Sequence, residues 1–343
     1  MRGRNHRSNV AARGQQAVRQ AVTSSVERPR ASWRRSTALT AAVGLLAGFV
    51  AVAPSDTQAL DLTSPPVAQW VSSLTPTTTG FGPIAPEGIA THGGVVHVAD
   101  PAGVDRFDAA TGSALASFPA PAGVVISDVA VDAAGNVVAV GDIDEGGDPN
   151  IWVGRFDAAG TVVWSDSFGN PYNPSAGLGE DTGRAVAIDG SGAIYVSGML
   201  DSTPQFRKAV VRKYDATATP TFAWQNEYLK GDEYLIGSGP VVADMAVASD
   251  GVFVVGEVLG PQGLGFAVRA SALTGQELAS SSSFLASTLS ARATGVTATD
   301  TAVYVTGGEI TRTAAGDGWD ARLVRLDPDD LTVVWSELIG TPI

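Results

Sequence analysis

A short block of residues recurs five times along the chain, and this repeat limits the fold more than any other feature. Each copy has a Val- or Ala-rich first part, a turn, and a second part that usually ends in Gly. The copies begin at Ile89, Val129, Val186, Met245 and Val296, which lie 40, 57, 59 and 51 residues apart. Self-similarity with a period of this size is typical of solenoids, propellers and other repeat arrays.

Two further segments follow each block. The first carries a basic residue and usually ends in Asp, at residues 104–108, 152–157, 210–215, 267–271 and 323–327. The second contains Trp164, Trp224 or Trp335 in three units, with Leu115 and Leu278 at the corresponding place in the other two. Every segment is short, rich in Val, Ile, Tyr or Phe, and bounded by Gly, Asp, Asn or Pro, which indicates strands joined by tight turns. Each unit therefore predicts four strands.

A four-stranded unit of about fifty residues cannot bury both of its faces alone, so it must pack against its neighbours. Radial repetition of four-stranded antiparallel sheets protects the sheet edges, and this predicts an all-β fold, a β-propeller of about five blades. A sixth candidate for the Trp strand occurs at Trp70. We interpret it as an extra or capping edge, with six blades, or an open arc completed by a partner, as the alternatives.

The repeated pattern resembles a known family. Residues 129–164 contain VAVD, GNVVAVG, RFDAAG and VW in that order. This succession resembles the bacterial secreted β-propeller repeat (SBBP-type), and the resemblance covers roughly residues 68–340. It implies the propeller fold and an extracytoplasmic location, and it implies no particular activity. The first and fifth copies depart from the Asp-Gly-Asn turn.

Recurring turn residues have an expected mechanical role. We expect Asp132, Asp189 and Asp300 to accept backbone N–H bonds in Asx turns, because a short carboxylate side chain favours this geometry. Gly135, Gly192 and Gly251 are expected to supply positive φ angles. The recurring basic residue is expected to lay its stem across a sheet and pair with a turn carboxylate. This residue is Arg106, Arg155, Lys213, Arg269 or Arg325, depending on the unit.

Residues 1–59 are expected to form an export signal. They hold nine Arg and only two acids, and a 16-residue apolar stretch, 38–53, follows the Arg34-Arg35 pair. This order of basic and apolar regions, with a cut predicted after Ala59, is typical of a signal peptide, and the arginine pair partly matches a twin-arginine signal. An uncleaved anchor and an organelle transit peptide are the alternatives. The expected location is periplasmic, cell-surface or extracellular.

Residues 60–343 are expected to form one propeller domain with no transmembrane segment. They contain 13 Lys and Arg against 33 Asp and Glu, a formal net charge of −20. A body this acidic repels phosphate backbones, so nucleic acid is not expected as a partner. The chain has no Cys, which excludes disulfides.

The sequence contains no recognisable catalytic motif, so no catalytic residue is assigned. There is no Gly-x-Ser-x-Gly and no His-Glu-x-x-His. His97 takes the strand position held by Tyr195 in another copy, and His92 falls in the preceding turn. Both are interpreted as structural or solvated residues, since two His without a third ligand do not make a zinc site.

An acidic loop, 142–150, is the best candidate for a bound metal. Asp142, Asp144 and Asp148 offer hard oxygen ligands of the kind that calcium prefers. Gly146 breaks the EF-hand pattern at a ligand position. The interpretation is therefore a calcium site or, alternatively, an ordinary solvated loop, and no cofactor is required.

We expect a non-enzymatic binding module whose ligand is a protein or a glycan. The loops between the second and third strands, 142–150, 199–207, 257–265 and 308–318, vary most and should lie on one face. The aromatic residues expected to contact the ligand are Trp152, Phe206, Phe266 and Trp319. The alternative is an extracellular propeller hydrolase or lyase that acts on a polymer with acidic residues, since glycosidase chemistry needs only two suitably spaced carboxylates.

The calcium hypothesis predicts that excess calcium raises the melting temperature of the chain and that a chelator lowers it. A ligand that binds only the folded state stabilises that state by about 2.7 kcal/mol when its concentration is a hundred times its Kd. A thermal-shift measurement with calcium and with chelator checks this. An unchanged melting temperature would contradict a calcium site.

Overall fold

The computed structural model describes twenty strands and no α-helix. The described residues are 88–170, 181–203, 206–228, 239–259, 263–282, 284–285, 290–313 and 316–339. Within these ranges there is no helix with the length and apolar character needed to cross a membrane. The predicted export signal and the Trp70 strand both lie outside the described residues.

The strands form five sheets. The first contains β1 (Ile89–His92), β2 (Val95–Asp100), β3 (Gly103–Asp108) and β4 (Ala114–Pro119). The second contains β5 (Val124–Val131), β6 (Val137–Asp144), β7 (Pro149–Phe156) and β8 (Val162–Phe168). The third contains β9 (Thr182–Ile188), β10 (Ile194–Thr203), β11 (Phe206–Tyr214) and β12 (Phe222–Tyr228). The fourth contains β13 (Pro240–Val247), β14 (Gly251–Val258), β15 (Leu264–Ser271) and β16 (Glu277–Ser281). The fifth contains β17 (Ala291–Thr299), β18 (Ala302–Thr313), β19 (Gly316–Leu326) and β20 (Val333–Ile339).

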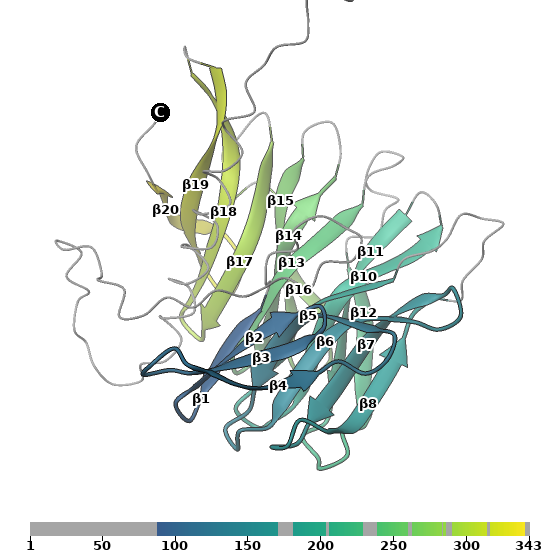
Figure 1. Cartoon of the computed structure of the whole chain (residues 1–343). Helices are drawn as coiled ribbons and strands as arrows, with labels where there is room; N and C mark the ends of the chain where they lie inside the picture. Colours follow the sequence, from purple (N-terminus) through teal and green to yellow (C-terminus); the bar gives the residue numbers. More distant parts are fainter. Residues whose placement is uncertain are drawn as a thin grey trace, which may run out of the picture. The chain divides into compact units, whose positions relative to one another are not determined.

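Each sheet pairs its four strands in chain order, and every pair is antiparallel. Figure 1 shows this order in the fifth sheet, where β17, β18, β19 and β20 lie side by side. The chain is an all-β, five-bladed propeller of four-stranded antiparallel sheets, so the predicted fold class and blade number are confirmed. The Trp strands of the repeat are the fourth strands β8, β12 and β20.

The core lies between successive sheets. One cluster joins Val104 and Phe118 of the first sheet to Trp152 and Phe156 of the second. Similar clusters join the second sheet to the third, the third to the fourth, and the fourth to the fifth. Burial of apolar surface on this scale is the main favourable term in folding.

The turns between the first and second strands follow the sequence prediction in two units. The carboxylate of Asp132 accepts the amides of Ala134 and Asn136, and that of Asp189 accepts those of Ser191 and Ala193. Gly135 and Gly192 have φ angles of 85° and 89°. These turns are Asx turns closed by a left-handed glycine, as expected.

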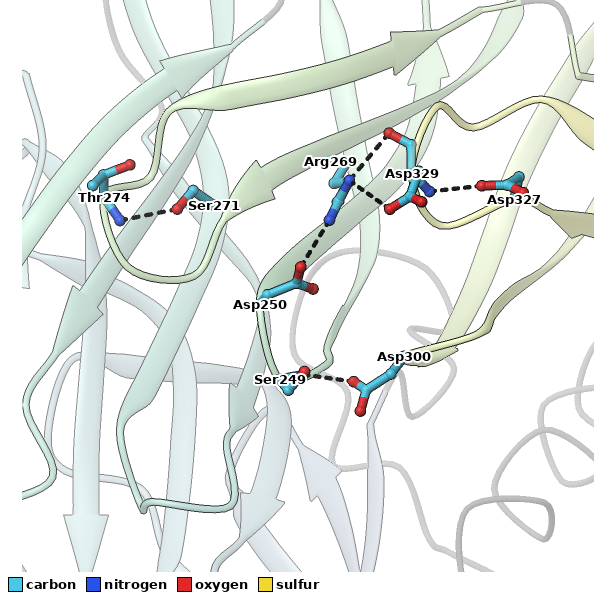
Figure 2. Close-up of polar contacts among 8 residues, drawn as sticks. All are labelled: Ser249, Asp250, Arg269, Ser271, Thr274, Asp300, Asp327 and Asp329. Atoms are coloured by element: carbon cyan, nitrogen blue, oxygen red, sulfur yellow. Dashed lines mark hydrogen bonds and ion pairs between the residues drawn. The ribbon is translucent and has the colours of Figure 1, made fainter.

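The fourth and fifth units depart from that prediction. Asp300 accepts the amide of Ser249, which belongs to the preceding sheet, instead of an amide of its own turn. Gly251 does not have a positive φ, because it already pairs with Ser271 as the first residue of β14. Asp300 therefore serves a contact between sheets here, and Figure 2 shows the bond between Ser249 and Asp300.

The recurring basic residue links neighbouring sheets in the second, third and fourth units. Arg269 pairs with Asp250 of its own unit at 3.1 Å and also donates to the carbonyl of Asp329 in the next sheet at 3.1 Å (Figure 2). Arg155 likewise pairs with Asp132 and donates to the carbonyl of Thr217 in the next sheet. The predicted pairing with a turn carboxylate is confirmed at these two positions, whereas Arg106, Lys213 and Arg325 donate to backbone carbonyls instead.

Partly buried carboxylates make a second kind of link between sheets, and this link has no counterpart in the sequence analysis. Asp128 accepts the amide of Val186 at 2.8 Å, and Asp244 accepts the amide of Val296 at 2.7 Å. In both cases the first strand of one sheet bonds to the first strand of the next. Burial raises the pKa of Asp244 to about 6 against the effect of these hydrogen bonds.

The glycine that ends the repeated block lies on the second strand and allows the backbone of the first strand to come close to it. The first strands of the second to fifth sheets each contain a bulge at the point where the second strand carries Gly141, Gly198, Gly256 or Gly307. A β-carbon at Gly256 would overlap the carbonyl oxygen of Val241, and the other three meet a first-strand carbonyl in the same way. Only glycine leaves room for this bulged backbone.

We therefore expect Gly256→Ala to destabilise the fold. The added methyl group must displace backbone, a change that costs about 1–3 kcal/mol in packed interiors, and urea unfolding measures it. Gly190→Ala is the matched control, because a β-carbon there meets nothing within 4 Å and Gly190 has no left-handed φ. Equal free energies of unfolding for the two variants would contradict the proposed role of the glycine.

Candidate functional site

The second and third strands extend further than predicted, so the loops that join them are shorter than predicted. Of the predicted loop 142–150, only 145–148 separates β6 from β7. In the third and fifth sheets, the strands leave only two residues between them, 204–205 and 314–315. The predicted boundaries were wrong here, because both strands continue to pair beyond the repeated glycine.

These hairpins all leave the same end of their sheets, because consecutive strands alternate in direction. The connections from each fourth strand to the next sheet leave from that end too. We call this end of the five sheets the hairpin end. Several carboxylates of the second and third sheets lie at this end together with Asn150 and Arg207, and this cluster is the candidate site.

The three predicted calcium ligands are placed apart by their hydrogen bonds. The carboxylate of Asp142 accepts the amide of Gly183 in the third sheet at 2.8 Å. The carboxylate of Asp144 accepts the amide of Gly147 within its own hairpin. The backbone carbonyl of Asp148 accepts from Glu145 and from Asn150. Across the described ranges no three His, Asp or Glu side chains form a group able to hold a metal, and calcium binding stays a prediction.

Asp181 is the most strongly perturbed acid of the site. It is 4% exposed, and its two carboxylate oxygens accept the amides of Asp201 and Asn170. Burial raises the pKa of Asp181 to about 6, and the charges of Asp201 and Asp148 add to the rise. The group therefore changes its charge close to neutral pH.

The hairpin of the second sheet is held by a side-chain network. One carboxylate oxygen of Glu145 accepts the hydroxyl of Ser167 at 2.8 Å, and the other accepts the amide of Asn150 at 3.2 Å. Asn150 is itself buried, at 8% exposed. In the third sheet, Arg207 pairs with Asp201 at 2.9 Å. The site thus presents carboxylates whose positions are fixed by donors from two sheets.

Gly169 leaves the space in which two of these groups approach one another. A β-carbon at Gly169 would overlap the Oδ1 atom of Asn150 and the Oδ2 atom of Asp181. Gly169 itself is exposed, whereas the side chains of Asn150 and Asp181 beside it are buried.

Two of the four predicted aromatic ligand contacts lie in the core between sheets. Trp152 is 3% exposed and its ring lies 6.4 Å from that of Phe156. Phe266 is fully buried in the cluster between the third and fourth sheets. The side chains of Phe206 and Trp319 lie outside the described residues. A ligand role for these four residues stays a prediction.

His97 is buried between sheets, in agreement with its interpretation as a substituted strand residue. It is 4% exposed, and burial lowers its pKa to about 4. Asp181 was not singled out from the sequence, and Asn150 and Asp201 were included only as members of the loops 142–150 and 199–207, because none of the three belongs to the repeated pattern. Their only sequence signal is their position beside a strand that the repeat identifies.

The architecture defines the chain as a β-propeller. No family model matches the sequence, and no curated protein matches it. A structure of a protein of unknown function from Bacteroides caccae is 14% identical, with a TM-score of 0.45, and covers 74% of this chain and 81% of that one.

Two enzymes of known structure are similar at the same level. The polysaccharide lyase Uly1 is 10% identical, with a TM-score of 0.45, and covers 79% of this chain and 76% of that one. The quinohemoprotein alcohol dehydrogenase ADHIIG from Pseudomonas putida HK5 is 14% identical, with a TM-score of 0.42. That match covers 73% of this chain and 52% of the dehydrogenase. These similarities concern the fold alone.

The buried state of Asp181 predicts a pH-dependent stability. Its pKa is about 6 in the folded chain and 3.8 as the ordinary value, so the folded state holds the proton more tightly. The contribution to the free energy of unfolding is complete below about pH 4 and is lost as the pH rises through about 6, by up to roughly 3 kcal/mol.

Urea unfolding between about pH 4 and 7 tests this. Asp181→Asn should lose that part of the pH dependence, whereas Glu277→Gln, an exposed acid on β16, should keep it. The same pH profile in all three proteins would exclude Asp181 as the titrating group.

Proposed function

We propose that the chain is an exported, non-enzymatic binding module and that its ligand contacts the hairpin end of the second and third sheets. Export and a secreted-propeller role rest on the N-terminal sequence and on the resemblance to the SBBP-type repeat. The alternative is a propeller hydrolase or lyase that acts on an extracellular polymer. The two proposals place the ligand at the same surface. They differ in whether the bound molecule is released intact or is cleaved.

The observation that carries the binding proposal is the fixed hydrogen-bond acceptors at the hairpin end. Glu145, Asp144 and Asp201 are each bonded to donors of the scaffold. Carboxylates that are already positioned lose little further side-chain entropy when a ligand arrives. Each carboxylate offers about four acceptor positions, so capacity for ligand donors remains.

This chemistry favours a ligand that brings positive charge and hydrogen-bond donors. The net charge of −20 over residues 60–343 attracts such a ligand and speeds its encounter. Lys- or Arg-rich protein segments and amino-bearing glycans share this chemistry. They are the two ligand sources that we propose to compare.

One observation favours the enzyme alternative. Asp181 has a pKa of about 6 and lies beside Asp201, whose amide it accepts. An acid poised near neutral pH suits proton transfer to or from a sugar oxygen. Both oxygens of Asp181 are bonded to backbone amides, so we place the binding role first.

The binding proposal predicts that Glu145→Gln weakens ligand binding roughly three- to tenfold and reduces its dependence on salt. The full chain would be screened against immobilised basic peptides and amino-bearing oligosaccharides, and bound ligands measured by calorimetry at two salt concentrations. Glu277→Gln, which removes the same charge from the outer strand β16, should bind as the unaltered chain does.

Three results would change this proposal. Equal loss in both variants would show a general charge effect and contradict a site at the hairpin end. Failure of every basic peptide and amino-bearing oligosaccharide to bind would contradict the ligand class. Shortened oligosaccharides in the incubated samples would favour the enzyme alternative.

A further inference from the structure

Each sheet has a forward face, which packs on the next sheet in the chain, and a backward face, which packs on the previous one. At the first two junctions, an aromatic residue of a fourth strand, on the forward face, meets an aromatic residue of the next third strand. Phe118 stacks on Phe156 with centroids 5.8 Å apart, and Trp164 meets Tyr214 edge-on at 5.0 Å.

Phe107 holds the corresponding position on the backward face of the first sheet. It pairs with Val96 in the same register as Phe156 with Val137 and Tyr214 with Ile194. Val96, Val98 and Phe107 form a cluster of their own, at 9%, 9% and 8% exposed, and its buried members are all from the first sheet. Within the described ranges no aromatic ring stacks on Phe107.

The forward face of the fifth sheet is the other unmatched surface. Trp335 is 37% exposed, and its ring contacts Tyr304 of its own sheet. Arg325 donates to Thr301 of its own unit, whereas Arg155 and Arg269 reach a carbonyl of the next sheet. All seven residues of β20 are exposed. Trp335 therefore does not supply the ring that Phe107 lacks in the described structure.

Residues 60–87 immediately precede the first sheet and contain a further Trp strand pattern. Trp70 is flanked by Gln69 and Val71, as Trp164 is flanked by Val163 and Ser165. Trp70 precedes Ile89, the start of the first repeat block, by 19 residues. The corresponding spacing is 22 residues from Trp164 to Val186 and 21 from Trp224 to Met245. Trp70 therefore precedes the first sheet by nearly the same number of residues as Trp164 precedes the third sheet.

We propose that the segment around Trp70, residues 68–72, docks on the backward face of the first sheet and that the Trp70 ring packs on Phe107. The occupant is this chain's own segment, because residues 60–87 lead directly into the first sheet and carry Trp70, the residue type that meets Tyr214 at the second junction. The docked segment covers Val96 and Val98 together with Phe107. It buries the backward face of the first sheet, as the preceding sheet buries the backward face of each later sheet. Apolar surface and an edge-on ring contact supply the attraction.

A double-mutant cycle tests the proposed contact. Trp70→Ala and Phe107→Leu should each lower the urea midpoint of the full chain, and the double variant should lower it by clearly less than the two shifts together. Trp164→Ala and Tyr214→Leu give the reference for a pair in direct contact. Trp335→Ala combined with Phe107→Leu should give additive shifts. Additive shifts for Trp70 with Phe107, or coupled shifts for Trp335 with Phe107, would overturn the proposal.

Limited proteolysis provides a second measurement that does not need a large stability change. Residues 60–87 contain no Lys or Arg, so chymotrypsin is the suitable protease and Trp70 one of its targets. Phe107→Leu should speed cleavage after Trp70 about tenfold, since the docked segment opens more often. Phe222→Leu, an exposed residue of β12, should leave that rate unchanged. The rate is measured at several protein concentrations.

Two outcomes of this experiment would overturn the proposal. Equal cleavage rates in the unaltered chain and in Phe107→Leu would show that Trp70 does not depend on Phe107. Protection that appears only at high protein concentration would show that the face is covered by a second copy of the chain. Concentration-independent protection that Phe107→Leu removes supports docking within one chain.

Discussion

The structure depends on face-to-face packing between successive sheets. A single four-stranded sheet has too few residues to bury either of its two faces. Each sheet therefore buries its apolar side chains only by packing against the neighbouring sheets. Aromatic contacts such as Phe118 on Phe156 and Trp164 on Tyr214 lie at these junctions. Hydrogen bonds that link Arg155, Asp128 and Asp244 to the next sheet then restrict how the joined sheets slide or turn against one another. Loss of one junction would therefore affect both sheets that share it.

The two ends of the sheets are built differently, and this difference is the reason that we propose ligand binding at the hairpin end. At one end, short turns use Asp and Gly, and Arg155 and Arg269 bind turns of two units together. At the hairpin end, the second and third strands extend beyond the core and carry carboxylates toward solvent. Asp181 and Asn150 lie at the base of this end, where burial and hydrogen bonding hold them in place. A rigid scaffold with acceptor-rich hairpins suits recognition.

Much of the fold could be predicted from the sequence because the repeat consists of local sequence signals for strands and turns. Alternating Val and Ala, the turn residues Asp132 and Asp189, and the Trp of the fourth strand predict strands and turns within one unit. The extent of the hairpins could not be predicted, because strand pairing beyond Gly141 or Gly198 depends on hydrogen bonds between segments that look like loops. Trp152 and Phe266 were expected to contact a ligand, and only the packing of neighbouring sheets shows that both are buried.

The sequence by itself determined the four-stranded unit, the number of units and the acidic character of the body, since these follow from local pattern and composition. The tertiary structure alone decided which acids are buried and which sheets they join. Asp244 and Asp181 look like any other acid in the sequence, yet each accepts backbone amides from a distant segment and titrates near pH 6. The physical reason is that burial and these hydrogen bonds arise only when segments 11 to 52 residues apart are packed together, and no local pattern encodes that proximity.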